Sequence, residues 1–235
     1  NHNCFYNTKD SMFVSPQTFD MKHGCDVPED RGYRIKATAY VSQHGFIPTV
    51  VKPVYMPTEP DKLIWVDGDY CINTFTRSGL PKSAEEYSDA GRDYINLVKS
   101  HMEMICGGKE DAHILAQWLA HQVQFPGKKI LWSPLIQSVE GIGKTFLRHL
   151  LRCGLGGRNV GVVGPAQLVS AFNDWATDVC VNVLEELKIA GHNRYESLNA
   201  VKPLITDDFI QINPKGFKAY NTPNFVNYIA FTNAA

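Results

Sequence analysis

The second half of the chain alternates short apolar runs with apolar stripes at helical spacing. The runs have strand length and contain many β-branched residues, which predicts buried strands at 129–132 with 135–136, 160–163, 179–184 and 225–233. Between the strands, apolar spacing predicts a helix from about Phe146 to near Gly154 and another over about 168–175. Strands that alternate with helices favour a mostly parallel sheet with helices on both faces.

The segment before Pro126 has a different pattern. Two amphipathic helices are predicted, the first ending at Gly107 and the second at Pro126. Upstream of these helices, short extended runs predict strands at 34–41, 49–55 and 63–66. Pro53 interrupts the second run, which is typical of an edge strand or a loop. We therefore expect a small α+β accessory domain at 1–125, β-rich and then helical, and an α/β domain at 126–235.

Composition excludes few classes of protein. The formal net charge is −1, with 23 basic and 24 acidic residues, so nucleic-acid binding would need a local basic patch. Six scattered cysteines are typical of reduced thiols, which favours a cytoplasmic protein. No apolar run reaches the roughly 18 residues of a transmembrane helix. The chain begins without Met and ends in an apolar segment typical of a core strand, so we expect a piece of a longer protein.

Residues 138–145 read Ser-Val-Glu-Gly-Ile-Gly-Lys-Thr and lie between a predicted strand and a predicted helix. This is the context of a phosphate-binding loop, in which backbone N–H groups surround a polyphosphate at a helix N-terminus. Lys144 would reach the β- and γ-phosphates, and the Thr145 hydroxyl would bind Mg²⁺. Because Ser138 stands where the general pattern has Gly, an ordinary turn is the alternative. The predicted ATP-binding residues are Glu140, Gly141, Ile142, Gly143, Lys144, Thr145 and Phe146.

Two further strands carry polar residues at their ends. The run at 179–184 leads into Glu185 and Glu186, about 40 residues after Lys144. Neighbouring residues on a strand point in opposite directions, so we expect Glu185 to bind Mg²⁺ and Glu186 to activate the attacking water. Asn233 ends the last strand and would sense the γ-phosphate. The alternatives are a solvated loop for the two acids and a turn residue for Asn233. Lys144, Glu186 and Asn233 are the predicted catalytic residues.

These elements, in this order, resemble a superfamily 3 helicase of the phage or viral primase-helicase type. Residues 141–145 are similar to the family's A motif, 183–186 to its B motif and 229–233 to its C motif. Weaker likenesses precede the ATPase, in 55–57, 73–75 and the helical segment 117–120. The resemblance implies a P-loop fold of AAA+ type.

The resemblance also implies a function, an ATP-dependent DNA helicase that acts in phage or viral DNA replication. Residues 205–216 match the position of a DNA-contacting hairpin, with Lys215 as the contact and Lys218 beside it; a solvated turn is the alternative. The implied partners are single-stranded DNA, further copies in a hexameric ring, and a primase or polymerase domain in the same chain. The family's arginine finger normally follows the C motif, so we expect it beyond Asn233, and slow hydrolysis by this chain.

Three other interpretations stay open. A P-loop ATPase for DNA packaging or loading would use the same ATP site without the hairpin. A nucleotide-binding assembly module would bind ATP without hydrolysing it. Separately, two His-x-Cys pairs, His2 with Cys4 and His23 with Cys25, supply ligands that zinc accepts. Neither pair has the Cys-x-x-Cys spacing of common zinc modules, which favours ordinary loop residues.

Overall fold

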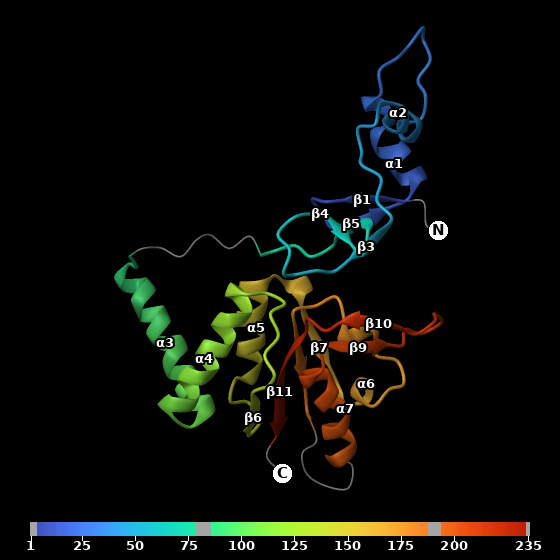
Figure 1. Ribbon diagram of the computed structural model, residues 1–235. Coiled ribbons are helices and arrows are strands. Elements are labelled where there is room, and N and C mark those ends of the chain that lie inside the picture. Colours follow the sequence, from blue (N-terminus) through green and yellow to red (C-terminus); the bar gives the residue numbers. More distant parts are fainter. Residues whose placement is uncertain (1–3, 79–85, 188–193, 234–235) are drawn as a thin grey trace. The chain divides into compact units, whose positions relative to one another are not determined.

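The computed structural model describes residues 4–78, 86–187 and 194–233 (Figure 1). The chain divides into two compact units, which are described separately. The first combines Asn1–Tyr55 with Glu59–Thr74, and the second combines Met56–Thr58 with Phe75–Ala235.

The first unit is a small α+β module. Its elements, in chain order, are β1 (Phe5–Asn7), β2 (Met12–Val14), α1 (Pro16–His23), α2 (Ala37–His44), β3 (Lys52–Val54), β4 (Leu63–Val66) and β5 (Asp69–Asn73). Strands β1 and β2 form an antiparallel pair, and a second sheet has the order β3-β5-β4. Pro53 lies on β3 at the edge of that sheet, as predicted, so its missing N–H leaves no neighbouring strand without a donor.

The strand predicted at 34–41 is wrong, because this segment enters helix α2. A side chain distant in sequence favours the helix: the Asp20 carboxylate accepts hydrogen bonds from the Thr38 backbone N–H at 2.8 Å and from its hydroxyl at 3.3 Å. A carboxylate on the first turn satisfies a donor that the helix leaves free. Gly45, at φ 63°, ends the helix in the left-handed conformation.

The second unit contains the predicted α/β domain. Its elements are α3 (Asp89–Cys106), α4 (Lys109–Gln124), β6 (Leu135–Ser138), α5 (Lys144–Leu155), β7 (Val160–Val163), α6 (Pro165–Leu168), β8 (Val181–Leu184), α7 (Arg194–Thr206), β9 (Phe209–Ile212), β10 (Tyr220–Pro223) and β11 (Asn227–Asn233). Strands β6, β11, β8 and β7 form a parallel sheet in that order, and β9 and β10 form an antiparallel hairpin.

Helices cover both faces of the parallel sheet, as predicted (Figure 1). Because crossovers between parallel strands are right-handed, the step from β6 to β7 places α5 on one face, and the return steps place α6 and α7 on the other. Residues of β7, β8 and β11 that face α7, among them Leu184 and Tyr228, share one buried apolar cluster with Leu204. This cluster, together with the pairing of β11 with β6 and β8, fixes the carboxyl ends of the strands, where the predicted site residues lie.

Two predictions within this unit need correction. Residues 129–132 do not form a strand, and a side chain takes one of their backbone hydrogen bonds. The Ile130 N–H donates to Asn227 Oδ1 at 2.8 Å, and the strand starts only after Pro134. The helix predicted over 168–175 is wrong, because α6 already ends at Leu168 and Asn173 is bonded to the backbone of the β9–β10 hairpin.

The predicted boundary at Pro126 falls inside the second unit, since α3 and α4 belong to it. Helix α4 packs closely on α5: a Cβ on Gly154 would lie 2.6 Å from Val123 Cγ2. In the described part of the chain, no helix is long and apolar enough to cross a bilayer. The six cysteines all lie within that part, and none forms a disulfide.

Lys129 provides a test of the packing around α7. Its largely buried amine donates to the Leu204 carbonyl at 2.6 Å and to the Val226 carbonyl, and burial lowers its pKa to about 7. Above pH 7 the folded amine loses its proton while the unfolded lysine keeps it. The unfolded state then binds more protons, so this residue makes stability rise with pH until about 10.5.

We therefore expect wild-type stability to rise by about 2 kcal/mol, relative to Lys129→Met, between pH 7 and pH 9. Thermal or urea unfolding of both proteins across this range measures the difference. Lys128→Met, at the exposed neighbouring lysine, is the control and should follow the wild type. A Lys129→Met variant whose stability changes in parallel with the wild type would contradict the assignment.

Candidate functional site

The phosphate-loop sequence forms the turn that its pattern predicts. It connects β6 to the N-terminus of α5, with Gly141 at φ 80° and Gly143 at φ 95°. Both values lie in the left-handed region that favours glycine. Helix α5 begins at Lys144, so its first N–H groups and the positive end of its dipole face the loop. This arrangement suits an anion.

Lys144 lies among oxygen atoms at the carboxyl end of the sheet. Its Nζ lies within hydrogen-bonding distance of four oxygen atoms: Ser138 Oγ at 3.0 Å, the Ser138 and Val139 carbonyls at 3.2 and 3.1 Å, and Asn233 Oδ1 at 3.1 Å. The Asn233 amide also donates to Glu140 Oε1 at 3.4 Å. The pairing of β11 with β6 explains why Asn233 reaches the phosphate loop, because Asn233 lies opposite Ser138 in the strand register.

The two acids follow β8, although not with the alternating directions that the sequence suggests. The strand ends at Leu184, and Glu186 takes φ 55°, an uncommon conformation for a residue with a side chain. As a result, both Glu185 and Glu186 line the same cavity as the phosphate loop. Glu185 makes an ion pair with Arg148 of α5, which the sequence analysis did not single out.

This cavity has a volume of about 340 Å³ and joins the predicted residues of three strand ends. It is lined by Glu140, Gly141, Ile142, Gly143, Lys144, Thr145, Glu185, Glu186, Phe231, Thr232 and Asn233. Of the predicted ATP and metal residues, only Phe146 does not line it. A hydroxyl and two carboxylates are ligands that Mg²⁺ accepts, and it usually completes its shell with water and substrate phosphates. The donor set therefore fits the ion.

His101 of α3 was missed as a neighbour of the phosphate loop. Its ring meets Phe146 edge to face, with centroids 5.2 Å apart, and its Nε2 lies 3.5 Å from the Gly143 carbonyl oxygen. A Cβ on Gly143 would lie 2.6 Å from the ring. The sequence shows His101 only as one member of an amphipathic stripe, which gives no sign of this contact.

The candidate DNA-binding residues lie outside the cavity. Lys215 and Lys218 are exposed on the loop between β9 and β10, and Phe217 between them is 76% exposed. Hydrogen bonds fix the base of this loop. The Asn213 N–H donates to Asn173 Oδ1 at 2.7 Å, and the Asn213 amide donates to the Ala171 carbonyl at 2.8 Å. The hairpin is therefore anchored to the segment after α6.

The proposed zinc ligands are not gathered in the described part of the chain. His2 lies outside it, Cys4 and Cys25 are exposed, and His23 is paired with Asp26 at 3.0 Å. Residues 4–78, 86–187 and 194–233 contain no group of three or more His, Cys, Asp or Glu side chains that could hold a metal.

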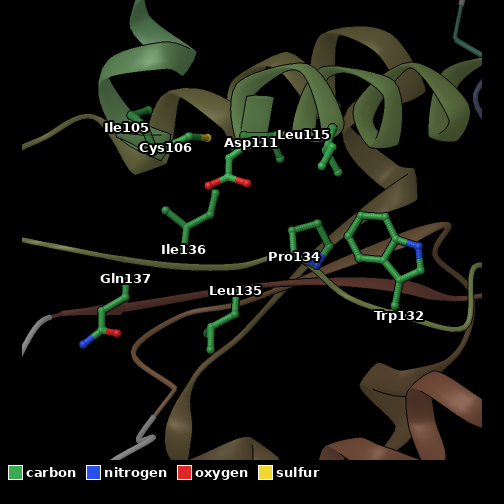
Figure 2. Close-up of a pocket in the computed structure, with 10 residues that line it drawn as sticks. Ile105, Cys106, Asp111, Leu115, Trp132, Pro134, Leu135, Ile136 and Gln137 are labelled. Atoms are coloured by element: carbon green, nitrogen blue, oxygen red, sulfur yellow. The ribbon is translucent and has the colours of Figure 1, made fainter. Parts of the chain in front are cut away.

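A second cavity, of about 370 Å³, lies between the α3–α4 turn and β6 (Figure 2). Ile105, Cys106 and Asp111 form one side, and Trp132 and Ile136 are on the other. It shares no lining residue with the phosphate-loop cavity and contains none of the predicted site residues.

The parallel sheet, the phosphate loop and the acidic strand end define an α/β domain with a P-loop-like fold. A family of unknown function, DUF5906, has a model that matches residues 136–235. No curated protein matches the chain.

Among solved structures, the apo C-terminal region of NrS-1 matches with a TM-score of 0.68 at 20% identity. A second structure of that region, its A form, gives 0.66 at the same identity. Each match covers 94% of this chain and 49% of the NrS-1 region, so the chain spans about half the length of its structural relative. At this identity the likeness shows a shared fold. Structures of NtrX from Brucella abortus align with a TM-score of only 0.33.

Two glycines of the loop offer a matched test of this geometry. Gly141 has a positive φ and open space around its missing side chain, whereas Gly143 has a positive φ and the His101 ring against it. Gly141→Ala should cost about 1 kcal/mol from backbone strain alone, or roughly 2–4 °C in Tm.

Gly143→Ala should lower Tm further, because its new methyl group displaces His101. This additional loss of Tm should disappear when Gly143→Ala is made in a His101→Ala background. There, Gly143→Ala should lower Tm only as much as Gly141→Ala does in the wild type. Equal effects of the two alanines would contradict the close contact between α3 and the loop.

Proposed function

We propose that this chain is the ATPase part of a superfamily 3 type DNA helicase that acts in phage or viral replication, in the host cytoplasm. One observation carries the proposal: Lys144, the Glu185–Glu186 pair and Asn233 converge on one cavity from three different strand ends. The substrate of this site is ATP with Mg²⁺.

Each residue has a distinct role in the proposed reaction. The Lys144 ammonium and the free N–H groups of the loop stabilise charge on the β- and γ-phosphates. Thr145 and Glu185 would hold Mg²⁺, whose charge would offset that of the phosphate oxygens. Glu186 accepts the proton of the attacking water, and the Asn233 amide orients that water and the γ-phosphate. In the family that the sequence resembles, a neighbouring subunit of a hexameric ring supplies an arginine finger.

The β9–β10 hairpin is the proposed contact with single-stranded DNA. Lys215 and Lys218 supply positive charge for phosphates, and the exposed rings of Phe217 and Tyr220 supply faces on which bases stack. Its anchoring to Ala171 and Asn173 links the hairpin to the segment that leads into β8. A primase or polymerase domain in the same protein would supply primers beside the helicase.

Glu186→Gln tests hydrolysis. The amide cannot accept the proton of water, so ATP turnover should fall by about 10²- to 10⁴-fold while the Kd for ATP stays within a few fold. Turnover is measured with single-stranded DNA present, and Glu110→Gln, an exposed carboxylate on α4, is the control. Turnover that survives in Glu186→Gln would contradict this role. A wild-type protein that binds ATP without turnover would favour a nucleotide-binding assembly module.

Lys215→Ala tests the DNA contact. Affinity for single-stranded DNA should fall on the order of tenfold at low salt, and the slope of log K against log salt should decrease by about 1. Basal ATP turnover should survive, whereas its stimulation by DNA should fall. Lys109→Ala, an exposed lysine on α4, is the control for loss of charge. Unchanged affinity and slope would favour a packaging or loading ATPase that does not use this hairpin.

A further inference from the structure

The ion pair between Arg148 and Glu185 places a cation on the carboxylate that is the proposed Mg²⁺ ligand. Arg148 Nη1 donates to Glu185 Oε1, and the two side chains are 22% and 38% exposed. A half-buried pair is screened by solvent less than a surface pair. One carboxylate oxygen of Glu185 is therefore already bonded to the positively charged guanidinium of Arg148, which has the same sign of charge as the metal.

The fold explains why these two residues meet. Leu184 faces the apolar cluster under α7, so Glu185, the next residue, is directed to the opposite face, where α5 lies. On α5, Arg148 comes one turn after Lys144 and thus lies on the same side of the helix. The helix presents two cations to the site, Lys144 toward Asn233 and Arg148 toward Glu185.

We propose that Arg148 is a positioning residue that holds Glu185 until the metal binds and competes with the divalent cation for this carboxylate. This inference rests on the proposed binding of ATP with Mg²⁺. Binding of Mg²⁺ then requires Glu185 to exchange the guanidinium for the metal. Arg148 has few substitutes for this partner: its Nε is buried and has no hydrogen-bond partner among the described residues. The exchange therefore lowers the affinity of the site for Mg²⁺.

The test compares the Kd for ATP in EDTA with the Kd for ATP in excess MgCl₂, both measured by equilibrium dialysis. The ratio of the two is the gain in ATP affinity that Mg²⁺ gives. In Arg148→Met the carboxylate has no competitor, so the gain should be on the order of fivefold larger than in the wild type, the scale of a partly exposed ion pair. Arg148→Lys keeps a competing charge and should stay close to the wild type. In a Glu185→Gln background, Arg148→Met should leave the gain unchanged, because the contested ligand has been removed.

Arg152→Met is the matched control. Arg152 lies one turn further along α5 and is exposed, so the substitution removes the same charge without touching Glu185. A gain that is unchanged or smaller in Arg148→Met, or equally larger in Arg152→Met, would overturn the inference while leaving ATP binding intact. If the wild type binds no ATP under either condition, the proposed function fails and this inference fails with it. Circular dichroism and Tm confirm that each variant is folded.

Discussion

The parallel pairing of β11 between β6 and β8 is the constraint on which the site depends. Its register places Asn233 opposite Ser138 on one side and Ala230 opposite Leu184 on the other. Residues almost a hundred positions apart in the sequence therefore meet at the carboxyl ends of the strands, where polar groups are exposed to the cavity. Because β11 lies between β6 and β8, it holds the phosphate loop and the acidic strand end one strand apart, with Asn233 between them. The backbone ladder thus determines which side chains share the cavity.

Two cations of α5 and the oxygen atoms that they contact define the electrostatics of the site. Helix α5 presents Lys144 and Arg148 one turn apart, and each is matched by an oxygen from a strand end, Asn233 for the first and Glu185 for the second. A triphosphate and a divalent cation bring opposite charges into this arrangement. Binding of a nucleotide with its cation would therefore replace the present oxygen partners of Lys144 and Arg148 with the phosphates, and would replace the arginine partner of Glu185 with the metal.

The sequence predicted the parts of this structure that local patterns determine. Buried parallel strands such as 160–163 are continuous apolar runs, and the glycine loop before a helix has a sequence pattern of its own. Failures came where a distant side chain decides local structure. Asp20 favours the helix at α2, and Asn227 takes the N–H of Ile130, which the pattern alone assigned to a strand. His101 and Arg148 were missed because a residue's type and helical position do not reveal which strand or loop it contacts.

The central claim is that the loop at 138–145 binds the phosphates of a nucleotide through Lys144. The most direct measurement is the Kd for ATP, determined by equilibrium dialysis for the wild type and for Lys144→Ala. Losing a charged donor to phosphate costs about 1.5–3 kcal/mol, so the Kd should rise by at least tenfold while Tm in the absence of nucleotide changes little. Equal affinity in the two proteins, or no ATP binding by the wild type, would contradict the account.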